Sequence, residues 1–214
     1  MSERGRRHYR TTAKRTQASS ATGDKARRHD EAVALGAAAK AALTAGRPQQ
    51  ARDMLEEQIA LLRVLGDRSG EAAALAALGT AHLAMGQSHR ALAMSEQAVA
   101  IQRAQGNDLG LCYALLTLAV CCDAMGDTAR TAAVYEEQLP LARAAGDVQL
   151  ETVILSQLGH AYARFGEAKR AFVCFEQAIA LLERQNDRTG QYTVWGAVAA
   201  LHLAEGDPQA AAAC

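Results

Sequence analysis

The stretch QLGHAYARFGEAKRAFVCFEQA, residues 157–178, decides the fold of this chain, because weaker copies of it recur through most of the sequence. Its second glycine, Gly166, belongs to a series spaced 40 residues apart: Gly46, Gly86, Gly126, Gly166 and Gly206. A second series lies midway between the members of the first: Gly66, Gly106, Gly146 and Asn186. Self-similarity at a fixed period of this length is the signature of a repeat architecture.

Each repeat predicts two helices separated by turns. Apolar residues recur at three- and four-residue intervals, as in Leu155, Leu158 and Tyr162. Glycine and asparagine readily adopt the left-handed conformation that ends a helix. Aspartates just after these turns are expected to cap the helix that follows: Asp67, Asp108, Asp127, Asp147, Asp187 and Asp207. The predicted fold is all-α, a right-handed α-solenoid of antiparallel helix pairs with about four units plus a terminal helix.

Composition divides the chain after residue 29. Residues 1–29 carry nine basic and two acidic side chains, a net charge of +7, whereas residues 30–214 carry 14 basic and 21 acidic side chains. Because residues 1–29 also lack large apolar side chains, they are predicted to form a disordered basic arm. The repeat array occupies residues 30–214, with units 31–70, 71–110, 111–150, 151–190 and a partial unit 191–214.

The basic arm has four possible roles: a solvated tail, an anchor on an acidic polymer or surface, a nuclear address, or an organellar transit peptide. As an anchor it would bind nucleic acid or the acidic surface of a cytoskeletal or axonemal filament. The residues expected to contact such a partner are Arg4, Arg6, Arg7, Arg10, Lys14 and Arg15.

One set of large and small residues resembles the signature of the tetratricopeptide repeat: Leu155, Leu158, Gly159, Tyr162, Gly166, Ala171, Phe175 and Ala178. The 40-residue period, together with GDRSGEAAALAALGTAHLAMG at 66–86, resembles the extended repeats of the Pins/LGN adaptors. That resemblance implies a concave groove that binds an extended peptide. The asparagines flanking the Leu-Gly pair in those adaptors are replaced here, for example by Gln157 and His160, so their ligand does not transfer.

The first helices of such units line the concave face, and units three and four are the most polar there. The candidate groove residues are Tyr113, Thr117, Asp123, Gln157, His160 and Arg164. They are expected to hydrogen-bond the backbone of a bound peptide or helix, with Arg164 and Asp123 selecting charge. The alternative interpretation is an ordinary solvated helix surface.

Two further features concern the shape of the array. Pro140 lies inside the second helix of unit three and predicts a kink there. The last unit is short, so Trp195, Val198 or Leu201 is expected to be exposed unless a partner or another copy covers it.

The sequence predicts a non-catalytic protein-interaction scaffold without cofactor, metal or membrane partner. It contains none of the motifs GxSxG, GxxxxGK[ST], HExxH or GxGxxG. Its five cysteines are odd in number and lack CxxC spacing, which favours a reducing compartment. We expect a cytoplasmic protein, with a cytoskeletal, ciliary or nuclear location as the alternative that follows from a filament- or nucleic-acid-bound arm.

Overall fold

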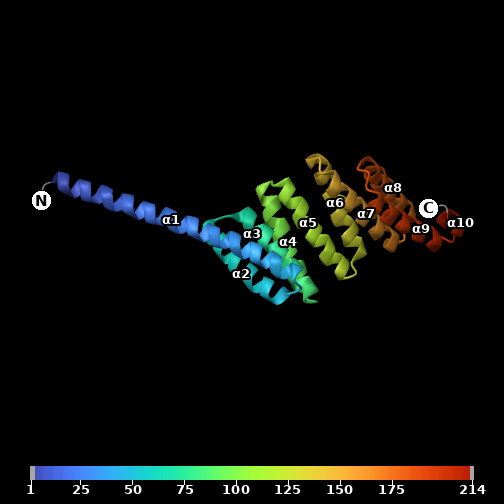
Figure 1. Cartoon of the computed structure of the whole chain (residues 1–214), viewed down its shortest axis with the longest axis horizontal. Helices are drawn as coiled ribbons and strands as arrows, with labels where there is room; N and C mark the ends of the chain where they lie inside the picture. The colour runs from blue at the N-terminus through green and yellow to red at the C-terminus, as the bar shows by residue number, and fades with distance from the viewer. Residues whose placement is uncertain (1–2, 213–214) are drawn as a thin grey trace.

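The computed structural model describes the backbone of residues 3–212 and the side chains of residues 23–212. Residues 3–212 contain ten α-helices and no strand (Figure 1). The helices are α1 (Glu3–Thr44), α2 (Pro48–Leu65), α3 (Arg68–Ala84), α4 (Ser88–Gln105), α5 (Asp108–Ala124), α6 (Thr128–Ala145), α7 (Val148–Phe165), α8 (Ala168–Arg184), α9 (Arg188–Ala204) and α10 (Pro208–Ala212).

The helices pack in pairs, α1 with α2 and so on to α9 with α10, and each pair also packs on the next. Figure 1 shows the pairs following one another along the long axis of the molecule. The predicted α-solenoid is therefore confirmed. Helices α3, α5, α7 and α9 each begin three residues before the predicted unit boundary, because the capping residue directly follows the turn.

The turns have the predicted left-handed conformation. Both glycine series have positive φ angles, and Asn186 has a φ of 55° in place of glycine. At the end of α7, Gly166 donates its N–H to the carbonyl of Ala163 and Glu167 donates to that of Tyr162. These bonds satisfy carbonyls that the helix end leaves free.

Five of the six predicted aspartate caps are present, and one prediction is wrong. Each of the five accepts a bond from the backbone N–H three residues later: Asp67, Asp127, Asp147, Asp187 and Asp207. At the start of α5 the cap is Asn107, whose side chain accepts from Gly110, while Asp108 lies in the first helical turn. The cap precedes the first helical residue, and Asn107 holds that position in the 40-residue frame.

The core alternates small and large side chains, as the repeat predicts. Ala171 is fully buried and Phe175 is 1% exposed. A Cβ added at Gly159 would lie 2.6 Å from the Phe175 ring, so only glycine fits there. The close approach of helix to helix thus depends on a glycine facing a ring.

The backbone of residues 3–29, the predicted basic arm, belongs to α1. It is helical, and α1 continues from it into the first pair without a break at residue 29. Many of these residues favour helix, and no proline interrupts them. In Figure 1 this part of α1 projects beyond the solenoid.

At Pro140, α6 continues as one helix from Thr128 to Ala145, so the proline does not divide it. The Pro140 side chain is exposed. Proline has no backbone N–H, so the Glu136 carbonyl, four residues earlier, lacks its usual helical hydrogen-bond donor. Glu136 lies on the same exposed side of α6 as Pro140.

The last pair differs from the expectation for the C-terminal end. Val198 and Leu201 are buried, and Trp195 is partly buried, with both α8 and α10 packed on α9. Tyr192 of α9 is 75% exposed, whereas Thr152 at the same repeat position is 7% exposed. The five-residue α10 is too short to reach the start of α9.

Candidate functional site

The first helices of neighbouring pairs are not evenly spaced. Helices α3 and α5 pack directly against each other, whereas no Cα of α5 lies within 8 Å of a Cα of α7. Helices α7 and α9 come that close only over a short stretch. Helix α7 therefore lies between two openings of the solenoid.

A pocket of about 230 Å³ lies where α5 and α7 separate. Asp123 of α5 forms an ion pair there with Arg164 of α7. Tyr135 of α6 lines the pocket from inside the core. The complete lining is Val120, Asp123, Thr131, Tyr135, Gln157, His160, Ala161 and Arg164.

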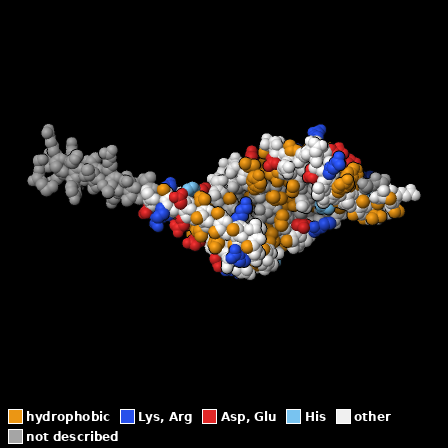
Figure 2. Space-filling model, in the orientation of Figure 1, with side chains coloured by type: hydrophobic (Ala, Val, Ile, Leu, Met, Phe, Trp, Pro, Cys, Tyr) orange, Lys and Arg blue, Asp and Glu red, His pale blue; other side chains and the backbone are white. Residues whose placement is uncertain are grey.

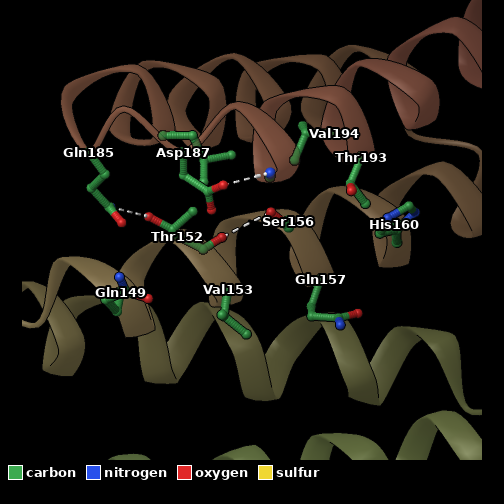
Figure 3. Close-up of a pocket in the computed structure, with 12 residues that line it drawn as sticks. Gln149, Thr152, Val153, Ser156, Gln157, His160, Gln185, Asp187, Thr193 and Val194 are labelled. Carbon is green, nitrogen blue, oxygen red and sulfur yellow. Dashed lines mark hydrogen bonds between the residues drawn. The ribbon is translucent and has the colours of Figure 1, made fainter.

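A second pocket, of about 310 Å³, lies between α7, α9 and the end of α8 (Figure 3). Part of its polar lining is bonded internally: Gln185 donates to the Thr152 hydroxyl at 3.3 Å, and Ser156 donates to the Thr152 carbonyl at 3.0 Å. The side-chain amides of Gln149 and Gln157 bond no other described residue.

Figure 3 shows Gln149, Val153 and Gln157 one after another along α7. They are four residues apart, so they share one helix face. Val153 is 45% exposed between the two amides. The edge of α7 thus offers an apolar contact flanked by two groups that can each donate and accept.

The structure brings four of the six predicted groove residues together, namely Asp123, Gln157, His160 and Arg164, in the 230 Å³ pocket. Tyr113 and Thr117 do not line it. Tyr113 is exposed on α5, and the Thr117 methyl faces α3, 3.6 Å from the position of a Cβ on Gly79. The predicted charge selectors are themselves an ion pair, so neither charge is free to act alone.

Sequence reasoning missed Tyr135, Gln149 and Val153. Tyr135 shares its repeat position with Phe175, a core residue, so its place in the repeat indicates packing and not a site. Gln149 and Val153 carry a usable signal, since they precede Gln157 by eight and four residues on one helix face. No sequence pattern indicates that the Tyr135 hydroxyl reaches a pocket.

The pocket between α5 and α7 has no net charge near neutral pH. Burial, with a contribution from Arg164, lowers the pKa of the His160 imidazole, which favours its neutral form. Burial and the nearby Asp123 carboxylate raise the pKa of the Tyr135 hydroxyl to about 12. The Arg164 and Asp123 charges cancel.

Among the residues whose side chains are described, no three His, Cys, Asp or Glu side chains gather into a possible metal site. Burial raises the pKa of four thiols, which disfavours their nucleophilic form: Cys112, Cys121, Cys122 and Cys174. Among the described helices, none combines the length and hydropathy needed to cross a membrane.

The predicted arm contacts lie outside the described side chains. Arg4, Arg6, Arg7, Arg10, Lys14 and Arg15 belong to α1 by their backbone. Figure 2 shows the described surface, with hydrophobic side chains gathered over the middle of the solenoid.

The chain was compared with known proteins. A tetratricopeptide repeat family model matches residues 30–104. A search of curated protein sequences finds no significant match. The fold is similar to that of BtubC (BKLC) from P. vanneervenii, with 21% identity, a TM-score of 0.76, and coverage of 93% of this chain and 85% of that one.

Two further structures are similar. The first is the structure of the nearly identical TPR-like repeats of a Podosopora anserina protein described as a kinesin light chain. It has 20% identity and a TM-score of 0.73, and the match covers 83% of this chain and 88% of that one. The second is a Rap protein complexed with competence and sporulation factor: 15% identity, TM-score 0.67, coverage of 85% and 51%. With the match over residues 30–104, these similarities identify the fold as a tetratricopeptide-repeat solenoid.

Proposed function

We propose that this protein is a non-catalytic scaffold that binds a peptide segment of another protein along α7. The observation that carries the proposal is the opening on both sides of this helix, with the unbonded amides of Gln149 and Gln157 along its edge. Such a groove suits a chain whose backbone presents alternating donors and acceptors.

The chemistry of α7 favours a peptide backbone over a small charged molecule. A glutamine amide both donates and accepts, so it pairs with a peptide group without a charge to balance. Val153, between the two glutamines, supplies apolar contact area that a peptide side chain can cover.

The structural neighbours support a binding role in general terms. Tetratricopeptide folds bind proteins or peptides, and one similar structure is a Rap protein in complex with competence and sporulation factor. Repeats of this kind are generally non-catalytic.

The proposal is tested by blocking the groove without disturbing the fold. Val153→Arg would place a long charged side chain between the two glutamines, at a position that is 45% exposed. The full chain and this variant would be used in parallel to recover partners from lysate, with crosslinking to locate the contact. We expect the crosslinked partner to be lost from the variant.

The matched control is Val173→Arg on α8, where the valine is 51% exposed and lies outside both pockets. It adds the same charge at an equally exposed site, so partner recovery should be unchanged. Equal recovery by the Val153 variant, or crosslinks that avoid α7, would reject the groove.

A second candidate function follows from the projecting part of α1. We infer that this helix, with the +7 charge of residues 1–29, docks the scaffold on an acidic polymer, either a cytoskeletal filament or a nucleic acid. The same proposal includes a cytoplasmic location for the protein. A filament partner would place it on the cytoskeleton, and a nucleic-acid partner would place it in the nucleus.

This second candidate predicts salt-dependent binding. Polymerised tubulin and a DNA duplex would be the two probes, each titrated at increasing salt. The test variant replaces six basic residues with glutamine: Arg4, Arg6, Arg7, Arg10, Lys14 and Arg15. Binding should fall steeply with salt and be lost in this variant, but be retained in an Arg184→Gln, Arg188→Gln control. Salt-independent binding would reject the electrostatic arm.

A further inference from the structure

The pocket between α5 and α7 contains an unusual tyrosine. Tyr135 is 4% exposed, and its hydroxyl bonds no residue among those whose side chains are described. Among the described residues, the side-chain oxygens that are both fully enclosed and without a hydrogen-bond partner belong to Gln102 and Gln138. The Tyr135 hydroxyl also has no partner but is not one of these enclosed atoms, so it remains accessible from the pocket that Tyr135 lines. A hydroxyl in such a place costs free energy unless something in the pocket bonds it.

Other hydrogen-bonding groups face the same space without partners. Gln157 and His160 both line the pocket, and neither bonds another described residue. The His160 ring is held edge-on against Phe175, with centroids 5.2 Å apart. This contact fixes the orientation of the ring while its nitrogens remain available.

The ion pair completes the set. Asp123 and Arg164 are each about half exposed, so both retain bonding capacity beyond their mutual contact. The carboxylate can accept from a ligand and the guanidinium can donate to it. A carboxylate ligand would face Asp123 and a cationic ligand would face Arg164, which disfavours both.

We infer that this pocket receives an uncharged carboxamide side chain, asparagine or glutamine, from the peptide bound along α7. A carboxamide presents a donor and an acceptor on adjacent atoms, and it therefore matches Asp123 on one side and Arg164 or Tyr135 on the other. An apolar side chain would desolvate the ion pair and the Tyr135 hydroxyl without replacing their bonds. This inference rests on the proposed peptide-binding function.

A random linear peptide library displayed on phage would be selected on the immobilised full chain. We expect the enriched peptides to share an asparagine or glutamine at one position. Replacing that residue by leucine in a synthetic peptide should weaken binding about 3- to 10-fold, the effect of one or more lost hydrogen bonds.

Tyr135→Phe removes only the hydroxyl and should reduce the preference for a carboxamide by a similar factor. Tyr162→Phe is the matched control, because the Tyr162 hydroxyl bonds Glu136 and Arg170 away from the pocket. Asp123→Asn should shift selection toward aspartate and glutamate, since it leaves the Arg164 charge unbalanced. Circular dichroism would confirm that each variant is folded.

The outcomes separate the two proposals. Peptides whose binding is lost in Val153→Arg but which share no carboxamide, or which are unaffected by Tyr135→Phe, overturn this inference and leave the groove in place. If every selected peptide binds Val153→Arg normally, the groove and the inference both fail. A shared carboxamide that is lost in Tyr135→Phe and retained in Tyr162→Phe supports the inference.

Discussion

The interface between α3 and α5 and that between α5 and α7 occupy equivalent places in the repeat but have different shapes. The first is closed, and the second is open by more than 8 Å between Cα atoms. One repeat position accounts for the difference. It is held by Ser95 on α4 and by Tyr135 on α6, 40 residues apart.

Ser95 shows why that position controls the spacing. It is fully buried, and its hydroxyl lies 3.3 Å from the Cys121 sulfur of α5 and bonds the Ala91 carbonyl at 2.9 Å. A Cβ on Gly79 of α3 would lie 2.8 Å from the same hydroxyl. The small side chain therefore lies between two first helices and allows them to meet, whereas the Tyr135 ring at this position keeps α5 and α7 apart.

The largest expected effect comes from removing the Tyr135 ring. Tyr135→Ser deletes a ring that is 4% exposed and should lower the free energy of unfolding by about 3–5 kcal/mol. It should also let α5 and α7 approach, which spin labels on the two helices would report as a shorter distance. Urea unfolding measures the first effect, with Tyr135→Phe as the control.

Tyr135→Phe should leave unfolding nearly unchanged, because the hydroxyl makes no bond to a described residue. A loss below about 1 kcal/mol in Tyr135→Ser, or an unchanged label distance, would contradict the role of this position in opening the groove.

The reverse substitution should open the closed interface. Ser95→Tyr forces a ring between Gly79 and Cys121 and should destabilise the protein by about 1–3 kcal/mol through overpacking. Labels on α3 and α5 should move apart. The control Ser95→Ala removes only the hydroxyl and should lower the free energy of unfolding by about 1 kcal/mol or less. An equal loss of stability in Ser95→Tyr and Ser95→Ala would show that side-chain size at this position is unimportant.

The smallest expected effect concerns an ion pair between successive second helices, which is present beside both the closed and the open interface. Glu96 pairs with Arg130 across α4 and α6, and Glu136 pairs with Arg170 across α6 and α8, each 34 residues apart. Because the side chains of these pairs are about half exposed, Glu96→Gln and Glu136→Gln should each cost about 1 kcal/mol or less. The Glu136 variant should cost more, since Glu136 also accepts from the Tyr162 hydroxyl.

The Glu136 effect should depend on pH. The bond from Tyr162 and the nearby Arg170 guanidinium lower the pKa of Glu136 in the folded state below its ordinary value of 4.5. Its contribution is therefore present above the unfolded-state pKa and disappears as the pH falls through the lowered folded-state pKa. The stability difference between wild type and Glu136→Gln should vanish in acid, and a difference that persists there would exclude the ionised carboxylate as its cause.

Much of the fold follows from local chemistry that the sequence displays. The glycine series and Asn186 mark the turns, since only such residues enter the left-handed region readily. Asn107 shows the limit of that reading, because the helix cap is defined by its place before the first turn and not by residue type alone. The low apolar content of residues 3–29 predicts disorder, whereas many of the same residues favour the helical backbone that α1 has there.

The candidate site was only partly predictable. The repeat frame alone placed Asp123, Gln157, His160 and Arg164 on the first helices of units three and four. It did not indicate Tyr135, and it included Thr117, which faces α3. Burial and pocket lining are properties of two or three helices together, so a pattern along one helix does not contain them.

The sequence by itself determined the repeat, the helix pairs and the turns, because each depends on residues within a few positions of one another. The tertiary structure decided where the solenoid opens. That opening depends on whether a serine or a tyrosine lies between helices from different repeats, and the distance between those helices exists only once the pairs are stacked.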